Sequence, residues 1–274
     1  QIVAAAALCS ALAGRASLGL GRNTLRQAQT EGTPVAPART PVLFFNPRSG
    51  GGKAEQHDLA AACRARRIEA VELRDGADLG KLARDAVERG ADVIGMAGGD
   101  GSQALVAAVA AEAAVGFVCV PAGTRNHLAL DLGLERNDVL GALDAFGPAV
   151  ERRIDLGEVN GQVFVNNVSL GAYAEVVQSD EYRDAKVATA VQMLPDLVGR
   201  RAEPLDLRFT DRDGLACETA TVIQVSNNAY ELQTFTGMGA RPRLDEGCLG
   251  IVTLSFDAGA DVAAFVALTL AGRT

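Results

Sequence analysis

The chain has 274 residues, of which 48% are hydrophobic and 22% are charged, which is ordinary for a packed protein of two domains. Its 34 acidic residues outnumber its 26 basic ones, and the net charge of −8 argues against a nucleic-acid-binding surface. The five scattered cysteines and two histidines form no C-x-x-C or H-E-x-x-H pair, so neither a disulfide framework nor a common zinc site is expected. A reducing, cytoplasmic compartment fits this cysteine usage best.

Residues 1–41 are expected to form an apolar segment followed by a linker. Residues 2–13 are apolar but supply only about half of the roughly 20 residues that a membrane-spanning helix needs. A basic flank from Arg15 to Arg26 follows, as at the cytoplasmic end of such a helix. We expect the end of a transmembrane helix here, with an Ala-rich surface helix as an equal alternative. Residues 27–41 are polar and proline-rich, which predicts a linker.

Residues 42–148 are expected to form one α/β domain. Apolar runs of strand length alternate there with segments of helical periodicity. The expected strands are 42–45, 68–73, 92–97 and 116–120, and the expected helices are 54–65, 79–88 and 103–113. This alternation predicts a doubly wound, mostly parallel sheet that binds ligands at the carboxyl ends of its strands.

The first expected strand leads into a glycine-rich stretch, residues 46–53, which we call the first loop. Its sequence, Asn46-Pro47-Arg48-Ser49-Gly50-Gly51-Gly52-Lys53, differs from a Walker A loop because Ala54, not Ser or Thr, follows the lysine. Consecutive glycines cost backbone entropy and typically mark a place where a ligand or another chain segment approaches closely. We expect a nucleotide site of another kind, and the alternative is a flexible surface hairpin.

The third expected strand ends in the second loop, Gly98-Gly99-Asp100-Gly101-Ser102, which opens a helix. Its N–H groups and the helix dipole can therefore face an anion. The stretch also matches the weak dinucleotide pattern G-x-G-x-x-A, but no acidic residue follows at a suitable place to bind a ribose. The carboxylate of Asp100 would repel a phosphate unless it holds a metal ion or accepts a proton from an attacking hydroxyl. The alternative is a tight turn in which Asp100 is a solvated cap.

The fourth expected strand leads into the third loop, Pro121-Ala122-Gly123-Thr124-Arg125-Asn126. It supplies a hydroxyl, a guanidinium and an amide, all able to bind phosphate or hydroxyl groups. Taken alone it is an ordinary turn, and it gains weight as the third polar loop on one sheet edge. His127 beside it is expected to be a hydrogen-bonded structural residue rather than a titrating base.

Residues 149–274 are expected to form a second, mostly antiparallel domain. Asn160-Gly161 lies between alternating apolar residues, which is a strong hairpin signal because both residues tolerate positive φ. Further expected strands are 205–210, 219–226 and 249–256, with a helical insert around 180–198.

Together the three loops resemble the diacylglycerol kinase catalytic family, which includes bacterial lipid kinases and relatives of sphingosine kinase. The first loop is similar to the family's N-P-x-S-G-x-G-K and the second to its G-G-D-G-T. The third loop, with Leu128-Ala129 and Leu132-Gly133, is similar to P-x-G-T-x-N-x-x-A-x-x-L-G. The resemblance covers residues 42–256.

The resemblance implies an α/β ATP-binding domain over residues 42–148 and an antiparallel β-sandwich that binds lipid over 149–274, with ATP in the cleft between them. It implies a set of nucleotide-binding residues: Asn46, Pro47, Ser49, Gly50, Gly52, Lys53, Gly98, Gly99, Gly101, Ser102, Gly123, Thr124 and Asn126. Residues 164–171 would line the cleft. Asp245, in a segment similar to D-D-G-x-L, would hold a structural Mg2+, although Asp245-Glu246-Gly247 also predicts a hairpin turn.

The chain departs from the family pattern at two places. The family often has Asp directly after the loop Asn, where this chain has His127. The family's general base lies in a D-G-E motif, which is not found between Leu249 and Thr274. We therefore expect the last strands and the general base to lie beyond Thr274, and we expect Asp100 to position metal or substrate.

The sequence thus predicts an ATP-dependent lipid kinase that transfers the γ-phosphate of ATP, with Mg2+, to a free lipid hydroxyl such as that of diacylglycerol. Its expected place is the membrane surface on the cytoplasmic side, with no nucleic-acid partner. An NAD kinase-like enzyme, which shares the G-G-D-G loop, is one alternative, and the first and third loops disfavour it. A catalytically silent nucleotide- or lipid-binding module is the other.

Overall fold

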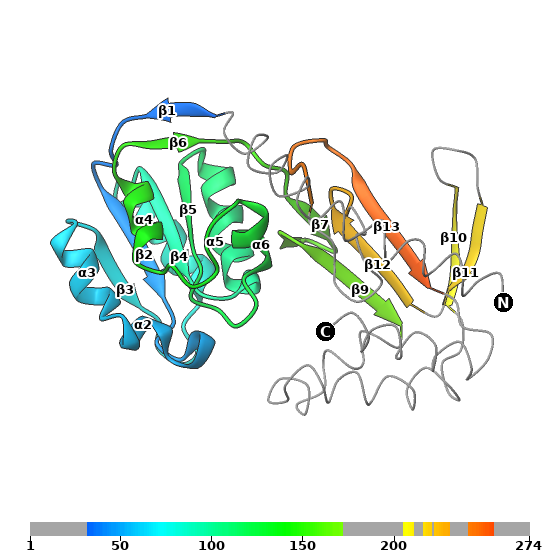
Figure 1. Ribbon diagram of the computed structural model, residues 1–274, viewed down its shortest axis with the longest axis horizontal. Coiled ribbons are helices and arrows are strands. Elements are labelled where there is room, and N and C mark those ends of the chain that lie inside the picture. The colour runs from blue at the N-terminus through cyan, green and yellow to red at the C-terminus, as the bar shows by residue number, and fades with distance from the viewer. Residues whose placement is uncertain (1–31, 172–204, 211–215, 221, 231–240, 255–274) are drawn as a thin grey trace, which may run out of the picture. The chain divides into compact units, whose positions relative to one another are not determined.

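The computed structural model describes residues 32–171, 205–210, 216–220, 222–230 and 241–254 (Figure 1). Contacts divide these residues into two compact units. One unit comprises residues 32–166 and 242–247, and the other comprises the remaining described residues. The expected apolar segment at 2–13 and the expected helical insert at 180–198 lie outside the described residues.

A four-stranded parallel sheet forms the centre of the first unit (Figure 1). Its order is β3-β2-β4-β5, and every neighbouring pair is parallel. The strands are β2 (Pro41–Phe45), β3 (Glu69–Glu72), β4 (Val93–Ala97) and β5 (Gly116–Val120). All five residues of β2 are buried, as expected for a central strand that is covered on both faces.

Helices pack on both faces of this sheet, and alternate side chains of β2 accordingly lie in two different hydrophobic clusters. The helices and 3-10 segments of the unit are η1 (Ser49–Gly51), α2 (Lys53–Gln56), α3 (Leu59–Ala65), α4 (Leu79–Glu88), α5 (Asp100–Ala113), α6 (His127–Asp131) and η2 (Gly141–Phe146). Leu43 and Phe45 pack with residues of α3 and η2. Val42 and Phe44 pack with residues of α4 and α5. The doubly wound parallel sheet predicted from the alternation is confirmed.

The helix expected over 54–65 is broken into α2 and α3. Asp58 adopts the left-handed backbone conformation, with φ of 43°, and its side chain accepts a hydrogen bond from the Ala61 amide at 3.3 Å. A side chain that caps a helix from a non-helical residue starts a new helix instead of continuing the old one. The break therefore has a local cause at Asp58.

Short antiparallel pairs flank the parallel sheet. β1 (Thr33–Val35) pairs with β6 (Ala149–Glu151), so part of the stretch expected to be a linker is a strand instead. A proline is tolerated there because a two-stranded ribbon leaves alternate amides without a ladder partner. β7 (Gly157–Val159) and β8 (Gln162–Phe164) form the predicted hairpin, with positive φ at Asn160 and Gly161.

The second unit is antiparallel throughout the part that the structure describes. β9 (Asn167–Gly171), β12 (Val222–Asn227) and β13 (Leu249–Leu254) form a sheet of order β13-β12-β9. β10 (Leu205–Thr210) pairs with β11 (Ala216–Ala220), so the single strand expected over 219–226 is shared between β11 and β12. After β5, all strand pairing in the described residues is antiparallel, starting with β6 near the expected domain boundary, but contacts keep residues 149–166 with the parallel sheet. No helix within the described ranges is both long and apolar enough to cross a bilayer.

Candidate functional site

The three loops follow three neighbouring strands of the parallel sheet. The first loop follows β2, the second follows β4, and the third follows β5. Parallel strands place their carboxyl ends on one edge, so all three loops lie at that edge. The Asn46 amide donates to the Ala97 carbonyl at 3.4 Å, which joins the starts of the first two loops.

The loops are also in direct contact through glycines. A Cβ placed on Gly50 would lie 2.4 Å from the Ala122 carbonyl oxygen. A Cβ placed on Gly123 would lie 2.5 Å from the Cα of Gly99. Glycine is therefore required at Gly50 and Gly123 by close approach, and the third loop touches both of the others.

The first loop winds through a left-handed turn before α2 begins. Gly50, Gly51 and Gly52 have φ values of 59°, 76° and 83°, a region that L-residues with side chains rarely adopt. Lys53 then donates from Nζ to the Gly123 carbonyl and to Asn137 Oδ1, each at 3.3 Å. This ammonium group therefore lies beside the third loop.

The second loop leaves the N-terminus of α5 open. No side chain caps this 14-residue helix, and its N-cap is Gly99. A Cβ on Gly99 or on Gly101 would meet no atom within 4 Å, and neither residue has positive φ. The fold thus does not require glycine at these two positions, and their missing side chains leave the first amides of α5 accessible to an anion.

The carboxylate of Asp100 accepts hydrogen bonds from the start of another helix, α6. Its Oδ2 accepts from the His127 amide and its Oδ1 accepts from the Leu128 amide, both at 3.1 Å. The N-cap residue of α6, Asn126, makes no capping bond of its own. The carboxylate therefore caps α6 from the neighbouring element, which gives the negative charge in the second loop a structural partner.

Asn126 holds the third loop in shape. Its side chain is 2% exposed; Oδ1 accepts from the Gly123 amide at 2.9 Å, and Nδ2 donates to the carbonyls of Pro121 and Gly123 at 3.0 Å each. Its amide atoms are thus already hydrogen-bonded inside the loop. Thr124 and Ser102 carry the hydroxyl groups of the two loops.

His127 and Gln103 are two further side chains near the loops, and the sequence predicted a role for the first but not for the second. Burial lowers the pKa of His127, and the charges of Asp100 and Asp131 oppose this shift only in part. Its imidazole is therefore neutral at neutral pH, consistent with a structural role. Gln103, in the first turn of α5, is buried and hydrogen-bonded to both neighbouring strands. In the sequence, Gln103 is only a polar residue between Ser102 and the apolar run that begins at Ala104, which does not distinguish it from a solvent-exposed helix residue.

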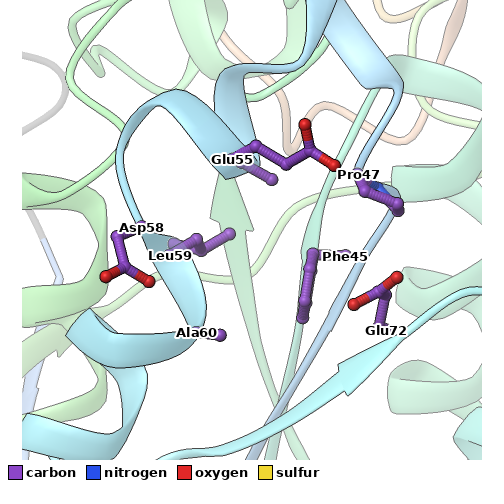
Figure 2. Close-up of a pocket in the computed structure, with 8 residues that line it drawn as sticks. Phe45, Pro47, Glu55, Asp58, Leu59, Ala60 and Glu72 are labelled. Atoms are coloured by element: carbon purple, nitrogen blue, oxygen red, sulfur yellow. The ribbon is translucent and has the colours of Figure 1, made fainter.

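A hollow of about 270 Å3 lies beside the first loop (Figure 2). Phe45 and Leu59 give it an apolar floor, and Glu55, Asp58 and Glu72 give it an acidic rim. Carboxylates repel phosphate, so the phosphates of a nucleotide are expected at α5 and not here.

Asp245 lies in a loop that is held by another carboxylate. Asp155 donates its amide to the Leu244 carbonyl and accepts the Gly247 amide on Oδ2, both at 2.6 Å. The two oxygens of Asp245 accept from Arg243 at 3.0 and 3.1 Å, and this hydrogen bonding lowers the pKa of Asp245.

The structure offers Asp245 little support as a metal ligand. Nowhere in the described ranges do three or more His, Cys, Asp or Glu side chains gather as a metal-binding group. A guanidinium already neutralises this carboxylate, so these residues do not fit a Mg2+ site as they stand. The assignment of Asp245 stays a prediction.

Residues 164–171, which were expected to line a cleft, comprise the last residue of β8, the two-residue connection to β9, and β9 itself.

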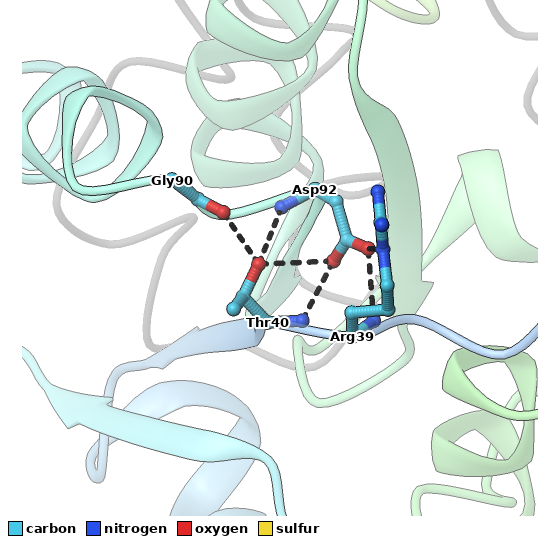
Figure 3. A network of polar contacts seen from close by, with 4 residues as sticks. All are labelled: Arg39, Thr40, Gly90 and Asp92. Carbon is cyan, nitrogen blue, oxygen red and sulfur yellow. Dashed lines mark hydrogen bonds and ion pairs between the residues drawn. The ribbon is translucent and has the colours of Figure 1, made fainter.

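The opposite edge of the sheet carries a polar network with a structural role (Figure 3). Asp92 accepts the amides of Arg39 and Thr40 at 2.8 and 2.9 Å, and Thr40 Oγ1 donates to the Gly90 carbonyl. These bonds join the residues that precede β2 and β4. The network is therefore not part of the loop edge.

Comparison with known proteins agrees with this geometry. Residues 40–159 match the family described as the diacylglycerol kinase catalytic domain. A diacylglycerol kinase of Bacillus subtilis is 32% identical over 141 residues, which cover 49% of this chain and 46% of that protein. A Pseudomonas fluorescens protein named "Probable lipid kinase YegS-like" is 32% identical over 144 residues, covering 50% of this chain and 47% of that protein. The chain thus spans about half the length of the curated relatives it matches.

A solved structure extends the likeness beyond the parallel sheet. The crystal structure of a diacylglycerol kinase from Bacillus anthracis covers 88% of this chain and 80% of its own, with a TM-score of 0.58 and 20% identity. At this identity the match concerns the fold alone. It confirms the predicted combination of a parallel sheet with flanking helices and antiparallel sheets.

Proposed function

Residues 40–159 match the diacylglycerol kinase catalytic domain, and from this match we propose that the protein transfers the γ-phosphate of Mg-ATP to a lipid hydroxyl. Diacylglycerol is the proposed substrate because it appears in the name of the Bacillus subtilis relative. The observation that carries the proposal is the contact of three glycine loops at one sheet edge, around the open N-terminus of α5.

In the proposed complex, main-chain amides do most of the phosphate binding. The first amides of α5 and those of Gly50 to Gly52 would surround the phosphates, with Lys53 and the Thr124 hydroxyl completing the site. Asn46, Pro47 and Ser49 would shape the first loop, Gly98 and Ser102 the second, and Asn126 the third. The Mg2+ is that of the nucleotide substrate, and it would neutralise charge on the phosphates.

The transfer itself needs alignment more than covalent participation by the protein. The lipid hydroxyl oxygen bonds to the γ-phosphorus, the bond between the γ-phosphorus and the bridging oxygen breaks, and ADP leaves. The hydroxyl proton passes to a base. Both oxygens of Asp100 already accept main-chain hydrogen bonds, so we assign it the positioning of the second and third loops and not this proton transfer.

A lipid substrate would bring the protein to a membrane surface, and we propose that this surface is the cytoplasmic face of the membrane. Lipid kinase is the activity in the names of its relatives, and a lipid hydroxyl is presented at the bilayer interface. No described residue identifies the acyl chains or the headgroup.

The test is a transfer assay with the full-length protein and γ-labelled ATP. The acceptors are diacylglycerol, a sphingoid base, an undecaprenol-like alcohol and NAD, with lipids in mixed vesicles. Label in a lipid product supports the proposal and names the substrate. Label in NAD alone would establish the NAD kinase alternative, and ATP binding without transfer to any acceptor would establish the silent module.

A further inference from the structure

Gln103 is the largest buried polar side chain that the proposed mechanism leaves without a role in the first unit. It is 1% exposed and lies in the first turn of α5, directly after the second loop. Its Nε2 donates to the Met96 carbonyl at 2.9 Å, to the Val120 carbonyl at 3.0 Å and to the Gly98 carbonyl at 3.3 Å. One amide group therefore reaches two strands and a loop.

The three acceptors lie at the two strand ends from which the phosphate loops start. Met96 is near the end of β4 and Gly98 begins the second loop, while Val120 is the last residue of β5 and precedes the third loop. β4 and β5 are paired up to Ala97 and Val120, where the ladder between them ends and the two loops begin. Gln103 thus joins the two strands at the last point where the sheet ladder still holds them.

The other half of the same amide has no such partner. Gln103 Oε1 is buried and has no hydrogen-bond partner among the residues that the structure describes. Rotating the amide would place this oxygen against three carbonyl oxygens, so the orientation is settled by the acceptors. An apolar side chain of similar length would avoid the cost of a buried lone oxygen. The hydrogen bonds that Nε2 donates are therefore the reason for an amide at this position.

We propose that Gln103 is a positioning residue that sets the spacing between the second and third loops and so the binding of the ATP phosphates. It acts through the contact of Gly99 with Gly123 and through the Asp100 cap on α6, both of which require that spacing. Its effect on ATP rests on the proposed function, whereas its effect on the loops does not.

The first measurement is amide hydrogen exchange in the absence of ATP, on the wild type, Gln103→Met and Gln103→Leu. Both substitutions keep the approximate volume and remove the donor. The matched control is Gln162→Met, which changes an exposed glutamine in β8. Exchange is expected to rise about tenfold in peptides covering 97–103 and 120–128, with the rest of the unit unchanged.

The second measurement is ATP affinity by calorimetry, well below the unfolding temperature of each variant. Both Gln103 variants are expected to bind Mg-ATP about tenfold more weakly than the wild type, and Gln162→Met is expected to bind equally well. A role confined to global stability would not alter the affinity of molecules that are already folded.

Three results would overturn the inference. They are unchanged exchange in both loops, exchange that rises evenly over the whole unit, and failure of both variants to fold, since Gln103 would then hold the domain and not the loops. If exchange rises in both loops but the variants bind ATP as tightly as the wild type, the proposed effect of Gln103 on ATP binding is wrong. A wild type that fails to bind ATP would instead contradict the proposed function, and the exchange result would still decide the spacing role.

Discussion

The glycines of the candidate site serve different physical needs, residue by residue. Gly50 and Gly123 are required because neighbouring backbone lies where a side chain would stand. Gly99 and Gly101 have open space around them and ordinary backbone angles. Under the proposed function, glycine at these two positions keeps the first amides of α5 accessible to a phosphate.

Gly101→Ala is expected to separate stability from binding. Alanine in a helix is more favourable than glycine, so the free energy of unfolding should rise by about 0.5–1 kcal/mol. The new methyl group would occupy the space over the first amides of α5, and Mg-ATP should bind about tenfold more weakly. Chemical denaturation and calorimetry on the same sample measure both quantities.

The control for this change is Gly80→Ala in α4, where a Cβ would meet only the end of the Arg84 side chain and Asp78 Oδ1 at 3.4 Å or more. It should stabilise the protein by a similar amount and leave ATP binding unchanged. Equal ATP affinity for Gly101→Ala and the wild type would refute the anion site at α5.

Among the elements, α6 depends on a cap that comes from another helix. Asp100→Ala removes both acceptors of the His127 and Leu128 amides and should cost about 1–2 kcal/mol of stability. Because α6 carries the third loop against the second, ATP affinity should fall as well. Urea denaturation and calorimetry would measure the two losses.

Asp78→Ala provides the comparison because it removes the cap of α4, where Asp78 accepts the Lys81 amide at 2.9 Å. It should lower stability by about 1 kcal/mol without weakening ATP binding. If Asp78→Ala and Asp100→Ala had the same ATP affinity as the wild type, the positioning role of Asp100 would be wrong.

The carboxylate of Asp92 joins the starts of β2 and β4, so the stability that this connection provides depends on pH. Burial alone would raise the pKa of Asp92, but hydrogen bonds from Arg39 and Thr40 outweigh it and hold the pKa below its ordinary value. A lowered pKa means that the ionised form stabilises the fold above the unfolded pKa of about 3.9. This stabilisation is lost as the pH falls through the folded pKa.

Asp92→Asn should therefore cost about 1–3 kcal/mol at about pH 6, and the cost should shrink as the pH falls to about 3. Unfolding free energies of both proteins across this range give the comparison. Asp144→Asn, which removes an exposed partner of Arg66, should change stability by less than about 1 kcal/mol. A cost for Asp92→Asn that stays constant with pH would show that the charge is not responsible.

For the whole molecule, the two units predict two unfolding transitions. All three loops belong to the unit of residues 32–166 and 242–247. A ligand stabilises only the unit that binds it, by about 2.7 kcal/mol at a hundredfold excess over Kd. Saturating Mg-ATP should therefore raise one thermal midpoint, by roughly 5–10 °C, and leave the other unchanged. Differential scanning calorimetry would reveal this, and equal shifts of both transitions would contradict it.

Much of the fold could be predicted because it depends on neighbours in the chain. The apolar run of β2, the helical spacing of α4 and the Asn160-Gly161 turn are local patterns, and each formed where it was expected. Strand and helix alternation then placed three loops on one sheet edge. The linker strand β1 was missed because it forms only by pairing with β6, more than a hundred residues later in the chain.

The sequence by itself determined the α/β order, the three loops, and the family resemblance that they carry. Only the tertiary structure decided what the polar side chains among those loops do. Asp100 bonds to residues 27 and 28 positions away, and Gln103 bonds to a carbonyl 17 positions away. Periodicity describes which face of an element is buried, whereas the partner of a buried polar group depends on which strand ends lie side by side.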